Sequence, residues 1–409
     1  MRALFSGVTG IRSHQVRMDV IGNNIANVNT TGFKSSRVTF QDVFSQTMSA
    51  GSAQTTPQQI GLGVGIGSTD LDMGAGSLQM TGRQLDLSIE GQGLFVLKGP
   101  DGTSVYSRAG NFDWDSEGFL VNPANGSRVQ GWKADANGKI VNPNSSGLTD
   151  IQMIRGAVSL AKQTGSVTVG GNLDAGATAD PTVDEYSTTF TAYDSLGNPH
   201  ALNLQFNKTS TNNWDWSVSG PAGVTVTPTS TTSFVFNTDG TMQSGQTGTL
   251  SLTAPGAGAQ TITLDFTTVT QAFAGTSGSS VLVRKVDGYP LGTLESVSID
   301  STGIVFGVFS NGFRRNLAQV ALADFANAGG LRKVGGSAFA ESSSSGAPQV
   351  GRPSTGGRGR LVSGNLEMSN VDLSTEFTNM IMTQRGFQAN TRIISAADEM
   401  IQDLVNLRR

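Results

Sequence analysis

The sequence predicts a mainly β protein, made of nested β domains of antiparallel hairpins, with N- and C-terminal α-helices that form a coiled-coil-like arm. Three observations predict this class. Apolar residues recur at steps of four and three at both chain ends, and they alternate with a period of two in between. All 12 prolines lie between Pro57 and Pro353. At 409 residues, the chain is long enough for roughly two to three domains.

The N-terminal pattern starts at Leu4 and predicts one amphipathic helix. It weakens at Gly22 and in the Asn-rich run NNIANVN, and residues 30–32 (TTG) are typical of a helix end.

The C-terminal pattern is stronger and predicts one long helix over 370–407, with Gly386 tolerated inside it. Ser369 and Asp372 form a candidate capping box ahead of this helix.

Both helices present an apolar line at heptad spacing, which we call the seam. We predict that it mediates polymerisation, because such lines pack against other helices. The seam consists of Leu4, Val8, Ile11, Met18, Ile25, Leu373, Phe377, Met380, Phe387, Ile394, Ile401 and Val405.

The middle of the chain reads as strands joined by tight turns. The strand segments are LDLSIEGQGLFVL, TTFTAYDSLG, HALNLQFN, WDWSVSG, TSFVFN, QTITLDFTTV and LESVSIDSTGIVFGVFSNG. Between them stand DSEG, DANG, DSLG, TDG and DSTG, in which Asp bonds the backbone ahead and Gly supplies a positive φ. These turns predict a series of antiparallel hairpins.

Composition shifts predict the domain borders. Residues 164–283, which are rich in Thr, Ser and Gly, form an inserted outer β domain within an inner β domain of 72–163 and 284–355. The helical arm takes 1–32 and 368–409, and extended connectors take 33–71 and 356–367. The Ser/Gly-rich stretch 341–359 reads as a flexible or extended segment.

Composition also excludes several functions. Only 14% of residues are charged and the net charge is −4, which argues against nucleic-acid binding and against a polybasic membrane site. The absence of cysteine excludes disulfides, thiol catalysis and Cys-ligated metal sites, and two histidines cannot form a multi-His metal centre. We expect no cofactor, no metal, no catalytic residue and no membrane insertion. We also see no cleavable signal peptide, so an exported chain would leave by another route.

Two segments resemble known kinds of ligand-binding loop. GLGVGIG at 61–67 resembles a phosphate loop but reads better as a strand with one bare face, which lets another backbone approach closely. Asp113, Asp115 and Glu117 resemble a calcium loop, but Ala124 stands where a bidentate Glu is required, so we predict a hairpin turn.

Three further sets of residues can be interpreted either structurally or functionally. Trp214 and Trp216 share one strand face, so they either fill a β core or form a sugar-stacking platform of a glycan-binding protein. His14 lies on the helical arm away from the seam, in a solvated or interface position. His200 follows a proline in a turn, with no partner evident. No arrangement of an enzyme nucleophile, base and acid stands out.

Neither helical arm is expected to be stable without packing against other helices. Each offers about six to eight large apolar side chains worth roughly 1.5–3 kcal/mol each when buried. Ordering some thirty residues costs on the order of 30–60 kcal/mol in backbone entropy. We therefore expect the arms to be disordered in a free monomer and to fold when subunits pack side by side.

The chain ends also resemble a known family. MDVIGNNIANVNTTGFKSSRVTFQDVF at 18–44 and GNLEMSNVDLSTEFTNMIMTQRGFQANTRIISAADEMIQDLVNL at 364–407 closely resemble the signatures of bacterial flagellar rod and hook subunits. Residues 91–122 and 303–331 are similar to internal parts of the same family. The chain length and the inserted domain resemble the hook branch. The longer stretch 45–62 is similar to one in distal rod subunits, which keeps a distal rod subunit as the alternative.

The resemblance implies a function. It implies a structural, non-enzymatic subunit of the flagellar hook that self-assembles into a flexible helical tube, a universal joint that transmits motor torque to the filament. The arm would line the channel, the inner β domain would form the wall and the inserted domain would lie outermost. Implied partners are further copies of the chain, the distal rod, the hook cap, the hook–filament junction proteins and the type III export apparatus. The implied location is extracellular, in the hook and basal body.

Overall fold

The computed structural model describes residues 2–49, 58–135, 138–140, 147–153, 156, 158–179, 186–230, 232–275 and 278–406. The chain divides into two compact units. The first unit contains 1–155, 297–307 and 315–409, and the second contains 156–296 and 308–314. Each unit is described below by itself.

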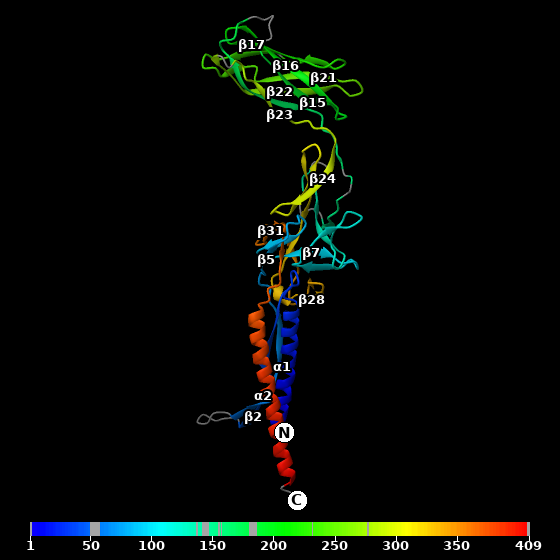
Figure 1. Cartoon of the computed structure of the whole chain (residues 1–409), viewed down its shortest axis with the longest axis vertical. Coiled ribbons are helices and arrows are strands. Elements are labelled where there is room, and N and C mark those ends of the chain that lie inside the picture. Colours follow the sequence, from blue (N-terminus) through cyan, green and yellow to red (C-terminus); the bar gives the residue numbers. More distant parts are fainter. Residues whose placement is uncertain are drawn as a thin grey trace. The chain divides into compact units, whose positions relative to one another are not determined.

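Two long helices lie side by side in the first unit and run antiparallel (Figure 1). Helix α1 spans Arg2–Ala26 and helix α2 spans Leu373–Asn406, so the two predicted helices are confirmed. The cap of α2 differs from the predicted box. Asp372 alone caps the helix, because its Oδ1 accepts the backbone N–H of Ser374 at 2.8 Å. Hydrogen bonds to its carboxylate, of which the one from Ser374 has the largest effect, hold the pKa of Asp372 below its ordinary value.

The segment after α1 forms strands. β1 (Ser36–Asp42) pairs antiparallel with β4 (Val64–Leu71), and between them β2 (Ser45–Ser49) pairs with β3 (Gln58–Gly61). The predicted strand in GLGVGIG is therefore confirmed over Val64–Gly67, within β4. The expected connector 33–71 is extended but paired, because its alternating polar and apolar residues suit a two-stranded ribbon.

The rest of the first unit is a β core. Its strands are β5 (Leu78–Met80), β6 (Leu87–Glu90), β7 (Leu94–Lys98), β8 (Ser104–Ser107), β9 (Asp113–Trp114), β10 (Leu120–Asn122), β11 (Ser127–Lys133), β12 (Thr149–Asp150), β25 (Ile304–Phe309), β26 (Arg314–Val320), β27 (Leu322–Asp324), β28 (Arg332–Gly335), β29 (Ala338–Ala340), β30 (Gln349–Gly351), β31 (Arg360–Ser363) and β32 (Asn365–Glu367). A short 3₁₀ helix spans Ala328–Gly330. The sheet order is β25-β26-β11-β7-β8-β29-β28.

Two apolar clusters fill this core, one around Phe95 and Phe112 and the other around Tyr106 and Phe339. The stretch 341–359 is part of the fold: β30 pairs with β27, and Ser345 is fully buried. Its serines satisfy one another and the backbone through a tight turn, so a Ser-rich composition does not make this stretch a loose segment.

The second unit contains a two-sheet sandwich. Its strands are β13 (Val158–Ser159), β14 (Ser166–Asp174), β15 (Tyr186–Tyr193), β16 (Pro199–Ser210), β17 (Asn213–Ser219), β18 (Thr225–Pro228), β19 (Ser233–Phe236), β20 (Met242–Ser244), β21 (Thr247–Thr253), β22 (Gln260–Ala272), β23 (Leu282–Val286) and β24 (Gly292–Ile299), whose last residues belong to the first unit. One sheet has the order β18-β21-β22-β14-β23 and the other β15-β16-β17-β19-β20.

The predicted strand segments are confirmed, and one pairing differs from the expected hairpins. β14 and β22 are parallel, and they are far apart in the sequence, so turn signals cannot reveal this pairing. Trp214, Trp216, Phe206, Phe234 and Phe266 fill the space between the sheets.

The Asp–Gly turns have the predicted geometry. Gly118, Gly197 and Gly303 have φ values of 81°, 87° and 78°, and the preceding aspartates accept backbone N–H groups two and four residues on. The segment resembling a calcium loop is such a turn, because Asp115 Oδ1 accepts the N–H groups of Glu117 and Phe119. The DANG turn lies partly outside the described residues.

Candidate functional site: the helix pair and its junction with the β core

Glycines let α1 and α2 approach closely. A Cβ on Gly10 would lie 2.6 Å from Asn390 Oδ1, and one on Gly7 would lie 2.9 Å from Ile394 Cγ1. Gly386 of α2 leaves room for the ring of His14 in the same way. Glycine costs about 1 kcal/mol in a helix relative to alanine, so its presence here reflects the close contact it permits.

The seam is not buried by this contact. Of its described side chains, Leu4, Ile11, Met18, Ile25, Met380, Phe387 and Ile394 are half-buried, and Val8, Leu373, Phe377 and Ile401 are exposed. The side chain of Val405 lies outside the described residues. The structure thus leaves the seam only partly covered, with Ile394 at the contact with Gly7 of α1, and the role of the seam in polymerisation stays a prediction.

A second apolar line on α2 was missed by the sequence reasoning. Met382, Ala389, Ile393, Ala396 and Met400 follow one another at steps of seven, four, three and four, and all are exposed. We call this line the second stripe. At 100° per residue, it lies on the opposite flank of α2 from the seam, with the α1-facing residues Thr383 and Ala397 between them. The heptad signal was present, but two alanines lowered its contrast.

The β1–β4 ribbon packs on the remaining face of α1. Asn24 joins three elements, because its Nδ2 donates to Ser36 O at 2.9 Å and to Glu376 Oε1 at 3.1 Å, while its Oδ1 accepts the Ser36 N–H at 3.0 Å. Gly63, between β3 and β4, lies against the Thr9 side chain with no room for a Cβ, whereas a Cβ on Gly61 would meet nothing within 4 Å, so the predicted bare face makes only part of the expected close contact. Asn24 thus serves as a polar connection between α1, α2 and the ribbon.

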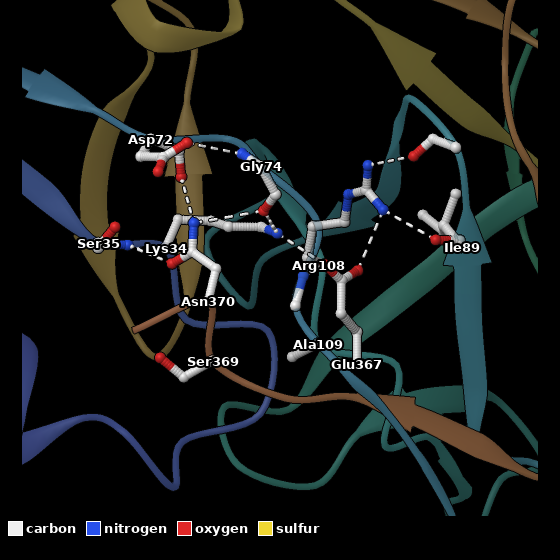
Figure 2. A network of polar contacts seen from close by, with 12 residues as sticks. Lys34, Ser35, Asp72, Gly74, Ile89, Arg108, Ala109, Glu367, Ser369 and Asn370 are labelled. Atoms are coloured by element: carbon white, nitrogen blue, oxygen red, sulfur yellow. Dashed lines mark hydrogen bonds and ion pairs between the residues drawn. The ribbon is translucent and has the colours of Figure 1, made fainter. Parts of the chain in front are cut away.

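A buried ionic network joins the ends of both helices to the β core, and we call it the junction (Figure 2). Lys34 Nζ lies 2.6 Å from Glu367 Oε1, and Arg108 Nη1 lies 3.0 Å from Glu367 Oε2. The Lys34 and Glu367 side chains have no exposed surface, and Arg108 is 4% exposed. Lys34 follows α1, Glu367 precedes α2 and Arg108 belongs to the β core, so one carboxylate holds three segments.

Backbone carbonyl groups accept further hydrogen bonds from the two cations of the junction, whereas the buried Arg108 Nε has no hydrogen-bond partner among the described residues. Lys34 Nζ donates to Gly74 O at 2.6 Å, and Arg108 donates to Ile89 O and Gly91 O at 3.0 and 2.6 Å. Asn370 Oδ1 accepts the Ser35 N–H at 2.8 Å (Figure 2). Burial lowers the pKa of Lys34, while the hydrogen bond and charge of Glu367 oppose this shift. A charge network of this kind is specific in geometry, since removing one member leaves a buried charge without a partner.

The remaining sequence readings are resolved in the second unit. Trp214 and Trp216 are 0% and 2% exposed, so they fill the core and offer no platform for a sugar. His200 does have a partner, because its Nε2 lies 3.0 Å from Asp194 Oδ2. The turn DSLGNPH brings His200 back to Asp194 at its start. This contact cannot be recognised when the residues are considered one at a time. Among the described residues, no helix has the length and apolar character to cross a membrane.

Four family models match the chain. The model of the flagella basal body rod protein matches 6–34, and that of the flagellar basal body rod protein C-terminal region matches 362–407. The flagellar hook protein D1 domain model matches 88–172, and the flagellar basal body protein D2 domain model matches 169–289. The helices and the two β regions are thus matched separately.

A relative in Borreliella burgdorferi, a flagellar hook protein, is 40% identical, with all of both chains covered. The chain belongs to the flagellar hook protein family. A flagellar basal-body rod protein of Bacillus subtilis is 32% identical, again with all of both chains covered. A crystal structure of a Helicobacter pylori flagellar hook protein matches with a TM-score of 0.51 at 15% identity, covering 71% of this chain and all of that one. This last match shows the fold.

Proposed function

We propose that copies of this chain assemble into the flexible helical tube of the hook, with the helix pairs packed side by side around a central channel. One observation carries this proposal: although glycines bring α1 and α2 into close contact, the described seam side chains stay half-buried or exposed and the second stripe stays exposed. Burying a large apolar side chain is worth roughly 1.5–3 kcal/mol, so both lines favour contact with other helices.

The seam and the second stripe lie on opposite flanks of α2, and this arrangement favours one kind of assembly. A single self-complementary patch closes a two-fold dimer, whereas two different patches produce a head-to-tail contact that extends to a ring or a helical polymer. The helix pair therefore supports an open assembly. Because isolated helices are marginal in water, we expect the arms to become ordered as the polymer forms.

The junction and the inserted domain support a division of mechanical roles. Lys34, Glu367 and Arg108 connect both helices to the β core through buried, directional contacts, which suit the transmission of torque. The surface of 164–283 is rich in Thr and Ser, and such surfaces make many weak and replaceable polar contacts. We propose that the inner β domain forms the tube wall and that the inserted domain lies outermost, where contacts slide as the tube bends.

Export and partners follow from the same proposal. The subunit would pass unfolded through the type III apparatus, and it would contact the distal rod, the hook cap and the hook–filament junction proteins. The role is structural, with no catalytic step.

Sedimentation of full-length protein tests the assembly. Phe377→Ser in the seam and Met382→Ser in the second stripe are each expected to raise the critical concentration for polymer about tenfold or more, since both side chains are more than half exposed in the single chain. Phe273→Ser, at an exposed position of the inserted domain, is the matched control and should change it less than twofold. Equal effects of all three variants would contradict the proposal.

A distal rod subunit is the second candidate, favoured by the full-length similarity to a rod protein. Electron microscopy of the polymer separates the two, because a hook gives curved tubes and a rod gives straight ones. Deleting about 165–283 should leave tubes that assemble but are straighter. If this deletion abolished assembly, the proposed division of roles would be wrong.

A further inference from the structure

Four charged residues form a line along α2, which we call the charged column. Arg385, Arg392 and Glu399 recur at steps of seven, Asp403 follows one turn later, and all four are exposed. At 100° per residue, they lie on the face of α2 opposite α1, between the seam and the second stripe. Within the described residues, none of the four takes part in an ion pair.

The two signs of charge are separated along the column. The arginines come first and the carboxylates follow, so the column has an arginine half and an acidic half. Glu399 and Asp403 are four residues apart, a spacing at which like charges repel each other on a helix. The nearest opposite charges, Arg392 and Glu399, are seven residues or about 10 Å apart along the axis, which is not the spacing of a helix ion pair. A single helix therefore leaves the column unneutralised.

Neighbouring copies bring columns side by side. This inference rests on the proposed assembly and needs no ordered arm in a free chain. Copies joined by repeated head-to-tail contacts point the same way along the tube, so neighbouring α2 helices are parallel. Helices that pack through the seam and the second stripe lie about 8–10 Å apart. Their columns then run along the same open face, within reach of the long Arg and Glu side chains.

The order of the charges selects one axial shift between these helices. Without a shift, arginines lie beside arginines and carboxylates beside carboxylates, and both arrangements are repulsive. A shift of about 14 residues, or roughly 21 Å, brings Arg385 of one copy level with Glu399 of the next. The same shift brings Arg392 within one turn of Asp403 of that copy. A shift of this size thus neutralises both halves of the column.

We propose that the charged column sets the axial register of the tube, because the arginine half of one α2 pairs with the acidic half of the α2 in a neighbouring copy. Exposed ion pairs are individually weak. Charges beside an apolar helix contact act mainly on the choice and orientation of the partner. The partner that this face fits is therefore a second copy of the chain, shifted along the axis.

Charge reversal in the full-length protein tests the pairing by sedimentation at low salt, where screening is weak. Arg385→Glu with Arg392→Glu makes the column wholly negative, and Glu399→Lys with Asp403→Lys makes it wholly positive. Each double variant should raise the critical concentration for polymer about tenfold or more. The variant with all four changes has opposite halves again and should return to within about threefold of the wild type. Double variants that polymerise like the wild type, or a fourfold variant no better than the doubles, would overturn the proposal.

A net-charge control separates register from general repulsion. Glu295→Lys and Glu341→Lys, at exposed positions outside α2, are added to the arginine reversal, which gives the net charge of the fourfold variant. This variant should stay as impaired as the arginine reversal, and its rescue would contradict the proposal. If the wild type formed no polymer, the proposed assembly would fail and this inference with it. A wild-type polymer with unaffected charge variants would refute the register alone.

Cross-linking measures the shift directly. Arg385→Lys keeps the charge and supplies an amine that a carbodiimide joins to a touching carboxylate, with loss of water. Positions 385 and 399 of one helix are about 21 Å apart, so an amide link between them must join two copies. Mass spectrometry should find position 385 linked to Glu399 or Asp403 in the polymer and not in dispersed chains. A polymer without either link would overturn the proposal.

Discussion

The helix pair and the inserted sandwich satisfy their side chains in different ways. The sandwich buries large aromatic residues, including Trp214 and Phe266, between its own two sheets. The helix pair makes its internal contact with glycines and leaves large apolar residues such as Phe377 and Met400 exposed. One region buries its large apolar side chains within the chain, and the other leaves several of them exposed.

The largest expected effect lies at the junction. Glu367→Gln removes the carboxylate between Lys34 and Arg108 and should destabilise the first unit by about 3–5 kcal/mol, because two buried cations lose their partner. Unfolding in denaturant, with hydrogen exchange as the readout, measures this loss of stability. Glu90→Gln breaks the exposed pair with Arg360 and is the control, expected to cost about 1 kcal/mol or less. Equal costs would show that the junction is not a specific connection.

A core truncation tests the independence of the sandwich. Phe266→Ala removes a fully buried ring and should cost the second unit about 3–5 kcal/mol. Exchange protection in α1 and α2 should stay within twofold of the wild type. Loss of protection in both regions together would show that the two units unfold as one.

A substitution in the DSLG turn should have an effect of intermediate size on stability. Asp194→Asn should cost about 1.5–3 kcal/mol, because the ionised carboxylate accepts hydrogen bonds from His200, Asn198 and two backbone amides. Burial alone would raise the pKa of Asp194, but these hydrogen bonds lower it to about 2.

The pH dependence of this turn has a defined sign. The stabilisation by Asp194 is complete above the ordinary pKa of 3.8 and is lost as the pH falls toward 2. The difference in stability between wild type and Asp194→Asn should therefore shrink over that range in acid unfolding curves. A constant difference would contradict the role of the charged form.

The smallest effects lie within α1, where two glycines form a matched pair. Gly7→Ala places a Cβ 2.9 Å from Ile394 Cγ1 and 3.5 Å from the Asn390 carbonyl oxygen, and it should destabilise the helix pair by about 1–3 kcal/mol. A Cβ on Gly22 meets nothing within 4 Å, so Gly22→Ala should stabilise α1 by about 0.5–1 kcal/mol. Changes of the same sign in hydrogen exchange would show that α1 does not pack closely on α2.

The fold class follows from the sequence because each element carries a local signal. The heptad steps predicted α1 and α2, and Asp–Gly turns with period-two segments predicted the hairpins of the sandwich. The parallel pairing of β14 with β22 has no local signal, because it joins strands separated by several hairpins. The stretch 33–71 was read as a connector, although a strand was expected within 61–67, because nothing in the sequence indicated that this strand pairs with residues 36–42.

The candidate site was predicted only in part. Large apolar residues at heptad spacing identified the seam, whereas the alanines at positions 389 and 396 hid the second stripe. The junction could not be predicted, because Lys34, Arg108 and Glu367 carry no spacing pattern and meet only in the folded chain. The pairing of His200 with Asp194 was missed although both residues belong to one short turn.

The distance between Lys34 and Glu367 along the chain sets an order of events. They are 333 positions apart, so their contact closes a loop that contains most of the protein. Contacts of such long range form late, since the entropy of the intervening chain must be lost first. A chain that emerges with its N-terminus leading therefore cannot complete this connection until nearly all of it is released, and maturation of the subunit waits for its tail.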